Sequence, residues 1–272
     1  MSLKSRVNAA LPAAVRDRLA SPPPLSGPLA AGDRLLTAPA FVLSSVRSGS
    51  TLLRVLLNTH SQIHAPHELH LRNIWVKTRH HNTEWALHEM ELDPAQLTYL
   101  LWDRLLHRQL ERSGKRILVN KTPSDVFIVD RIRECWPDAR FIFLLRHPGA
   151  IMRSREKIGT FDAEANAARV LRYCEAVEAA RTRLPGLTVR YEDVATDPAA
   201  ETKRLCEFLG VTWEPGMVDY GEGDHGRYRR GIGDWNDKLK SGQVQAPPPP
   251  PPEGEVPQSL RPIAAAWGYL PT

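Results

Sequence analysis

Residues 44–53, which read SSVRSGSTLL, combine small, hydroxyl and basic side chains in a pattern that can bind an anion. They follow a short apolar run and lead into a helical stretch, and backbone N–H groups at a helix N-terminus attract phosphate. Gly49 lets the backbone approach such a ligand, Ser50 and Thr51 add hydroxyl donors, and Arg47 adds a fixed positive charge. The segment therefore predicts a phosphate-binding loop.

The same loop differs from that of a nucleotide kinase, which reads G-x-x-x-x-G-K-[ST]. Here there is one glycine, and Ser50 stands where the kinase has its lysine. The apolar run FIFLL at residues 141–145 is followed by Arg146 rather than by an aspartate that could hold magnesium. A P-loop phosphotransferase is therefore kept only as an alternative.

Two further segments can bind anions. In LRHPGAIMRS, Arg146 comes directly after FIFLL, at the end of a strand where open α/β sheets bind ligands, and Ser154 follows eight residues later. In YRRGIGDW, Arg229 and Arg230 precede Gly231, so that two cations adjoin backbone that can wrap around an anion. Together the three segments predict two anion sites on one sheet, which a ligand with phosphates at both ends would fill.

Strands and helices alternate in the expected fold. Apolar runs predict strands at residues 41–45, 117–119, 141–145 and 187–190. The first three are continuous rather than alternating, which is typical of a parallel sheet covered on both faces. Helical periodicity covers residues 95–112, 164–184 and 198–209, with stops at Gly114 and Gly210. We expect a single P-loop-like α/β domain with a central parallel sheet flanked by helices on both faces.

The ends of the chain are expected to lie around that domain. Residues 1–38 are predicted to be an extension, with a basic amphipathic helix at 4–20 and a proline-rich linker, and 39–272 the main domain. The six prolines of 247–252 adopt polyproline II and predict a stiff connector to a terminal helix at 258–270. The small apolar face of helix 4–20 leaves an oligomer open.

Composition excludes several other classes of protein. Of the 272 residues 42% are hydrophobic and 25% charged, which is ordinary for a folded domain rather than a disordered or fibrous one. A net charge of +5 suits a polyanionic ligand, but the basic residues gather at loops, so we expect no nucleic acid as partner. Three scattered cysteines and no apolar run of about 18 residues predict a cytoplasmic protein without a transmembrane segment.

The set SSVRSGSTLL, RHPGAIMRS, VRYED and RRGIGDW, in this order and spacing, resembles the sulfotransferases that use 3′-phosphoadenosine 5′-phosphosulfate (PAPS). The resemblance runs from about residue 41 to residue 235. APHELHL at residues 65–71 is similar to a segment of bacterial sulfotransferases of natural-product pathways, some of which modify β-hydroxyacyl chains. The resemblance to this family implies sulfuryl transfer from PAPS to a hydroxyl of a small-molecule or carrier-bound acceptor, with 3′,5′-adenosine bisphosphate as product and no metal.

The resemblance also implies roles for individual residues. Arg146 and Ser154 match the pair that holds the 3′-phosphate, and Tyr191 matches a position near the adenine. The family's R-K-G corresponds to Arg229, Arg230 and Gly231. The loop that holds the 5′-phosphosulfate corresponds to Arg47, Ser48, Gly49, Ser50, Thr51 and Leu52.

The residues at the catalytic positions differ from those of the animal cytosolic sulfotransferases. They carry lysine where Arg47 stands, and their K-T-H histidine is replaced by Pro123, while Lys121 is kept. Arg47 and Lys121 are expected to stabilise the charge that develops during transfer. We expect the base to be Glu68, because a carboxylate bordering the acceptor pocket can take the hydroxyl proton.

Three questions stay open at this stage. His70 is the second candidate for the base and His67 the third, whereas a zinc site is not expected because the HELH histidines are three rather than four residues apart. A non-catalytic nucleotide-binding module would keep the anion sites and dispense with the base. The acceptor itself cannot be read, although residues 71–112 and 161–180 are expected to line its pocket, with tryptophans at Trp75, Trp85 and Trp102.

Overall fold

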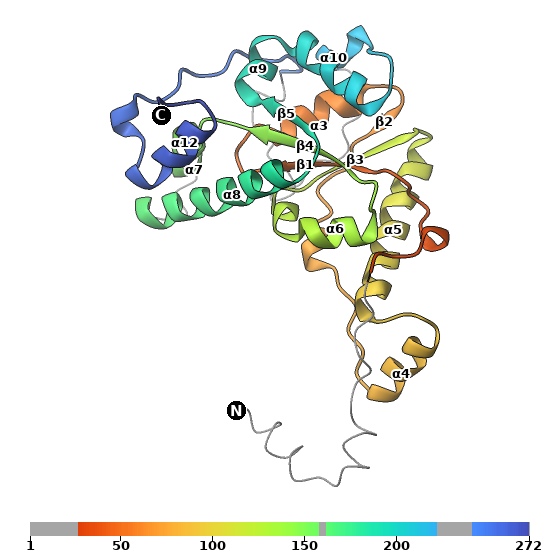
Figure 1. The fold of residues 1–272 in the computed structure, drawn as a ribbon. Coiled ribbons are helices and arrows are strands. Elements are labelled where there is room, and N and C mark those ends of the chain that lie inside the picture. Colours follow the sequence, from red (N-terminus) through yellow and green to blue (C-terminus); the bar gives the residue numbers. More distant parts are fainter. Residues whose placement is uncertain (1–26, 158–161, 222–240, 272) are drawn as a thin grey trace, which may run out of the picture.

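A computed structural model describes residues 27–157, 162–221 and 241–271, and its centre is a five-stranded sheet (Figure 1). The strands occur in the order β2-β3-β1-β4-β5, and every neighbouring pair is parallel. This confirms the predicted α/β fold with a central parallel sheet. Their bounds are β1 Ala40–Ser44, β2 Ile63–His64, β3 Ile117–Lys121, β4 Arg140–Leu145 and β5 Leu187–Arg190.

Helices cover both faces of the sheet, because the central strands are apolar on both sides. All five residues of β1 are buried. Phe41 and Leu43 belong to a core cluster with residues of α5, α6, α7 and α8, whereas Ala40 and Val42 belong to a second cluster with residues of α3 and α10. Figure 1 shows these two groups of helices on opposite sides of the sheet. The helices are α3 Ser50–Thr59, α4 His81–Glu89, α5 Pro94–Ser113, α6 Val129–Cys135, α7 Pro148–Glu156, α8 Ala163–Arg183, α9 Tyr191–Thr196, α10 Pro198–Leu209 and α12 Arg261–Ala266.

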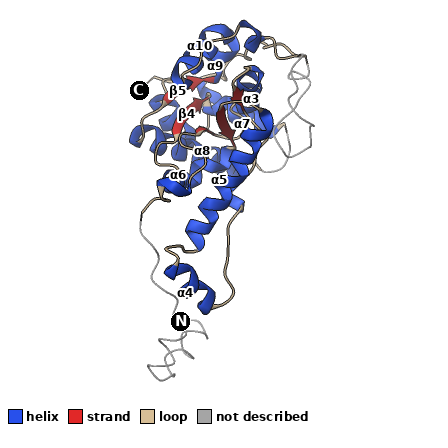
Figure 2. Ribbon diagram, turned by 90° about the vertical axis from the view of Figure 1, so that its right-hand side faces the viewer, coloured by secondary structure: helices blue, strands red, loops and turns tan. Residues whose placement is uncertain are grey.

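The predicted helices agree with α5, α8 and α10 to within one residue at each end. The stops are where the sequence placed them, since Gly114 and Gly210 end α5 and α10 in the left-handed conformation. The two-residue strand β2 was not predicted, because it is too short to show a pattern. Nor was α4, which has no buried residue and lies at the far end of α5, away from the sheet (Figure 2).

The C-terminal segment returns to the helical layer beside α7 and α8. The proline tract forms neither helix nor strand, and Pro251 packs so closely on α7 that a Cβ added at Gly149 would lie 2.7 Å from its Cγ. After it come a 3-10 helix, Gln258–Leu260, and α12, both within the range expected for the terminal helix. The buried Trp267 donates a hydrogen bond to Glu178 of α8, 2.9 Å away. The helix expected at residues 4–20 lies outside the described residues. No helix in the described part of the chain is long and apolar enough to cross a membrane.

Because every pair is parallel, the carboxyl ends of all five strands lie at one end of the sheet, with β1 between β3 and β4. The loop after β1 bends there against the first residue of α9. Gly49 has φ of 81°, and a Cβ at this position would lie 2.1 Å from the Tyr191 ring. Only glycine fits without a shift of that ring, so this close contact fixes where the loop meets the end of β5.

We expect Gly49→Ala to destabilise the protein more than Gly210→Ala does. Both glycines are left-handed, but nothing lies within 4 Å of a Cβ at Gly210. The control therefore measures the backbone cost alone, about 1–2 kcal/mol. Displacing Tyr191 adds about 1–3 kcal/mol at Gly49. Urea unfolding of both variants measures the difference in their free energies of unfolding. Equal losses would show that the Tyr191 ring moves aside at no cost.

Candidate active site

The loop between β1 and α3 has the features of an anion site. The N-cap of α3, Gly49, makes no side-chain hydrogen bond to the helix, and the first N–H groups of a helix have no partner within it. Ser48 is fully buried, and its hydroxyl has no hydrogen-bond partner among the described residues. Such a buried donor at a helix N-terminus is suited to a negatively charged ligand.

Arg47, Arg146, Ser154 and Tyr191 meet at this loop. Arg47 Nε donates to Ser154 Oγ at 3.1 Å, and Arg146 Nη1 donates to the Arg47 carbonyl at 2.7 Å. The Arg146 guanidinium lies 4.3 Å from the centre of the Tyr191 ring. Arg47 itself has φ of 67°, an unusual conformation for a non-glycine residue that the Arg146 bond supports. The structure thus brings together residues that sequence analysis assigned to two ends of one ligand.

Arg146 and Tyr191 are held in place by neighbours that sequence analysis missed. Glu192 accepts hydrogen bonds from the backbone N–H of His147 at 3.1 Å and from the Tyr269 hydroxyl at 2.6 Å. These bonds tie the starts of α7 and α9 to the C-terminal segment. Burial lowers the pKa of His147, although the Glu192 carboxylate opposes the shift. No local sequence pattern predicts these contacts, because Tyr269 is 77 residues from Glu192.

Lys121 and Glu68 form a buried ion pair at the end of β3. The Lys121 side chain is 1% exposed and its Nζ contacts Glu68 Oε1. The other carboxylate oxygen of Glu68 lies 3.5 Å from His70 Nε2. Burial lowers the pKa of Lys121, and the nearby Glu68 carboxylate opposes this shift. His67, the third candidate base, is partly buried beside Glu68 in the sequence. Three of the four residues expected to be catalytic are therefore grouped around Glu68.

A buried arginine, which sequence analysis did not single out, lies near this pair. Arg54 is 2% exposed in α3 and its Nη1 donates to the Ala65 carbonyl at 3.0 Å. Its charge lowers the pKa of Lys121 further. Burying an arginine is costly unless its donors are used. The bond to Ala65 also connects α3 to the segment that carries Glu68.

Other expected site residues are placed differently or are not described. Arg229, Arg230 and Gly231 lie outside the described residues. Trp102 is completely buried, with its indole N–H on the Ile74 carbonyl, so it belongs to the core rather than to an acceptor pocket. Trp75 and Trp85 are 61% and 38% exposed. In the part of the chain that the structure describes, no three histidine, cysteine or acidic side chains gather as metal ligands.

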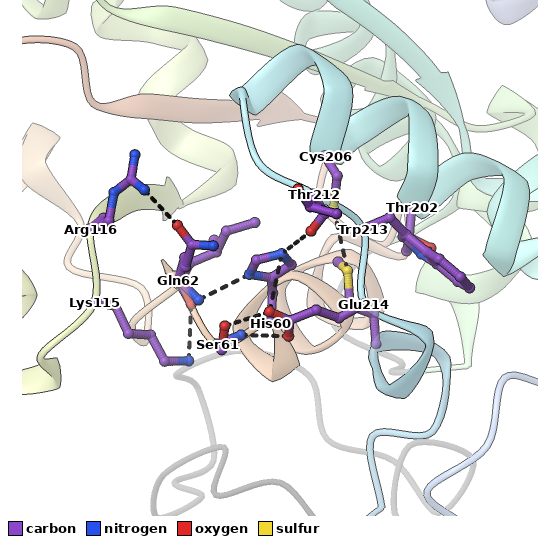
Figure 3. Close-up of polar contacts among 12 residues, drawn as sticks. His60, Ser61, Gln62, Lys115, Arg116, Thr202, Cys206, Thr212, Trp213 and Glu214 are labelled. Carbon is purple, nitrogen blue, oxygen red and sulfur yellow. Dashed lines mark hydrogen bonds and ion pairs between the residues drawn. The ribbon is translucent and has the colours of Figure 1, made fainter.

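A separate polar cluster at the other end of α3 is structural (Figure 3). His60 is fully buried, with Nδ1 accepting from the Gln62 N–H at 2.9 Å and Nε2 on the Thr212 carbonyl at 2.8 Å. Since Nδ1 accepts, the proton lies on Nε2. Glu214 accepts from the Ser61 N–H at 2.8 Å. These bonds join α3 to the segment after α10, and they use the polar atoms of His60 and Glu214.

The chain is similar in sequence to known proteins. A family described as "Sulfotransferase family" matches residues 39–215. Nodulation protein NoeE of Sinorhizobium fredii is 32% identical over 125 residues, 42% of this chain and 30% of its own. Protein-tyrosine sulfotransferase 2 of Gallus gallus is 24% identical over 207 residues, 67% of this chain and 53% of its own. The chain thus spans about half or less of these relatives.

Solved structures agree in fold. The sulfotransferase domain from the curacin biosynthetic pathway aligns with a TM-score of 0.61 and 24% identity over 86% of this chain and 99% of that domain. The sulfotransferase domain of the Synechococcus PCC 7002 olefin synthase aligns with the same score and identity over 88% and 98%. The family match covers well over half of the residues, including the loop after β1, Lys121 and Arg146. The chain therefore belongs to the sulfotransferase family.

Proposed function

We propose that this protein is an enzyme that transfers the sulfuryl group of PAPS to a hydroxyl acceptor, without a metal. The observation that carries the proposal is the arrangement at one edge of the sheet. The loop after β1 and Arg146 form an anion site at the ends of β1 and β4. Lys121, paired with Glu68, adjoins it at the end of β3, in register with Val42 of β1.

The residues present fit a ligand with two anionic ends. Arg146 is 9% exposed and its Nε has no hydrogen-bond partner among the described residues, so it can add a bond to a phosphate. Arg146 and Ser154 would hold the 3′-phosphate, the loop at 47–52 the phosphosulfate, and Tyr191 would lie near the adenine. Arg47 and Ser154 contact each other, so the residues proposed for the two ends of the ligand lie side by side.

Sulfuryl transfer to a hydroxyl requires a base that accepts the hydroxyl proton and positive charge that stabilises the transition state. The acceptor oxygen forms a bond to sulfur, the bond between sulfur and the bridging oxygen breaks, and the acceptor proton goes to Glu68. Arg47 and Lys121 stabilise the negative charge on the bridging and sulfuryl oxygens. Lys121 must therefore be protonated, which its pairing with Glu68 favours despite burial.

The acceptor is proposed only as a hydroxyl compound, small or carried by another protein. The names of the similar proteins support this level of detail, since the Gallus gallus relative is a protein-tyrosine sulfotransferase and the two solved domains come from the curacin biosynthetic pathway and an olefin synthase. The location is proposed to be the cytoplasm. Transfer of a phosphoryl group is less well supported, because Ser50 occupies the position of the kinase lysine.

Calorimetric titration with 3′,5′-adenosine bisphosphate tests the co-substrate. We expect tight binding that does not need magnesium, and weaker binding of 5′-AMP and ATP. Arg146→Ala should weaken it by about 10- to 100-fold, because a charged hydrogen bond is lost. Arg183→Ala is the control, since Arg183 is exposed and paired with Asp130. A preference for magnesium–ATP would instead support the phosphotransferase.

Glu68→Gln tests the base. We expect turnover with PAPS and a panel of phenols and aliphatic alcohols to fall by about 10²–10⁴-fold, because general base catalysis is lost. The affinity for the bisphosphate should be unchanged. Glu89→Gln, an exposed residue of α4, is the matched control. If Glu68→Gln turns over as fast as the wild type, the base is His70 instead. If the wild type itself shows no turnover, the result favours a non-catalytic module.

A further inference from the structure

Two exposed arginines meet at one aromatic ring, that of Phe127. The ring belongs to the 3-10 helix Pro123–Ile128, which follows β3 almost directly. The guanidinium carbon of Arg72 lies 5.1 Å from the centre of this ring, and that of Arg172 lies 4.7 Å from the same centre. Arg72 comes from the 3-10 helix Leu71–Asn73 and Arg172 from α8. Three segments that are far apart in the sequence thus bring two positive charges together.

The ring is held by the core, while both arginines are exposed. Phe127 packs against the core cluster, and its ring lies edge-on to that of Tyr173 of α8, with 4.7 Å between the ring centres. Tyr173 is 7% exposed, so Phe127 rests on a fixed neighbour. The face of an aromatic ring attracts a guanidinium but carries no net charge. Phe127 therefore positions the two cations without neutralising them.

Neither guanidinium has an anionic partner. In the part of the chain that the structure describes, neither makes a hydrogen bond or an ion pair. Glu175, three residues after Arg172 on α8, is exposed and is not paired with it. Arg146 also lies on a ring, but it donates to the Arg47 carbonyl. The N–H donors of the two arginines at Phe127 are thus available to a ligand.

This pair of arginines adjoins the residues proposed to carry out the transfer. Arg72 follows Glu68 by four residues, which span at most about 14 Å. Phe127 follows Lys121 by six residues, most of them in the compact 3-10 helix. Glu68 and Lys121 contact each other, so both segments start from one point. An acceptor whose hydroxyl lies at Glu68 can therefore extend to the two arginines.

We propose that Arg72 and Arg172, positioned by Phe127, bind an anionic group of the acceptor, a carboxylate or a phosphate, while its hydroxyl lies at Glu68. Guanidinium groups match the oxygens of both anions with paired N–H donors. Holding the arginines on a ring before binding reduces the side-chain freedom lost when the anion arrives. The inference rests on the proposed function and adds a class of acceptor, a hydroxyl compound with a negative charge at its other end.

Matched acceptors test the proposal on the protein saturated with 3′,5′-adenosine bisphosphate, which keeps the probes out of the co-substrate site. The probes 6-hydroxyhexanoate and 10-hydroxydecanoate carry a carboxylate, and 6-hydroxyhexyl and 10-hydroxydecyl phosphate carry a phosphate. The methyl esters of the two acids are the neutral controls. Calorimetric titration measures the Kd of each probe, and the carboxylate and phosphate series show which anion is preferred.

We expect at least one anionic probe to bind about 10-fold or more tightly than the neutral ester of the same chain length. The preference should shrink at high salt, because charges at exposed side chains are screened. Arg72→Gln and Arg172→Gln should each weaken binding of that probe by about 3- to 10-fold, and leave binding of the ester unchanged. Arg172→Lys keeps the charge and should recover part of the affinity. In turnover with PAPS, the KM for the anionic acceptor should rise more than kcat falls.

Arg108→Gln is the matched control, since it removes the same charge from an exposed position of α5. A loss of affinity as large in this variant as in Arg72→Gln and Arg172→Gln would overturn the proposal, because it would reflect net charge rather than a site. Equal affinities of the anionic and neutral probes overturn it too, and so does the absence of measurable binding of any probe. These outcomes leave the proposed function standing. Failure of the bisphosphate itself to bind overturns the proposed function, and this inference with it.

Discussion

The backbone at Gly49 passes so close to the Tyr191 ring that a side chain there would collide with it, and the rest of the site is arranged around this contact. It joins the loop after β1 to the residue that follows β5, across the end of β4, which lies between these two strands. Arg146, at the end of β4, fits between the two because it donates to the Arg47 carbonyl and stacks on Tyr191. One tight packing contact thus sets the positions of the cations and of the N-terminus of α3.

Buried charge is the second property of this edge of the sheet. Lys121, Arg54 and Arg146 are each at most 9% exposed. A stable core would not contain three such cations, because removing each from water is costly. Each of them contacts a specific acceptor: Lys121 contacts Glu68, Arg54 donates to the Ala65 carbonyl, and Arg146 donates to the Arg47 carbonyl. Buried ionisable groups of this kind concentrate at functional sites.

The sequence predicted those parts of the structure that depend on local pattern. Four of the five strands and the stops at Gly114 and Gly210 could be read from apolar runs and glycines. The residue types at the loop after β1 and at Arg146 indicated anion binding, and the family resemblance added roles. The contacts of Lys121 with Glu68 and of Tyr269 with Glu192 could not be read, because each joins segments that are far apart in the sequence. The third anion segment, around Arg229, lies outside the described residues and stays a prediction.

The C-terminal segment has a consequence for how the protein is made. Tyr269 donates to Glu192, Trp267 donates to Glu178, and Pro251 packs on Gly149, so residues 251–269 contact helices α7, α8 and α9, which precede them in the chain. During synthesis on the ribosome the central strand β1 emerges early, and it cannot pair on one side until β4 has been made, with β5 beyond it. The anion site reaches its full set of supports only after translation has passed residue 269. A truncated product would therefore carry every signature motif of the family and still lack part of the frame that holds them.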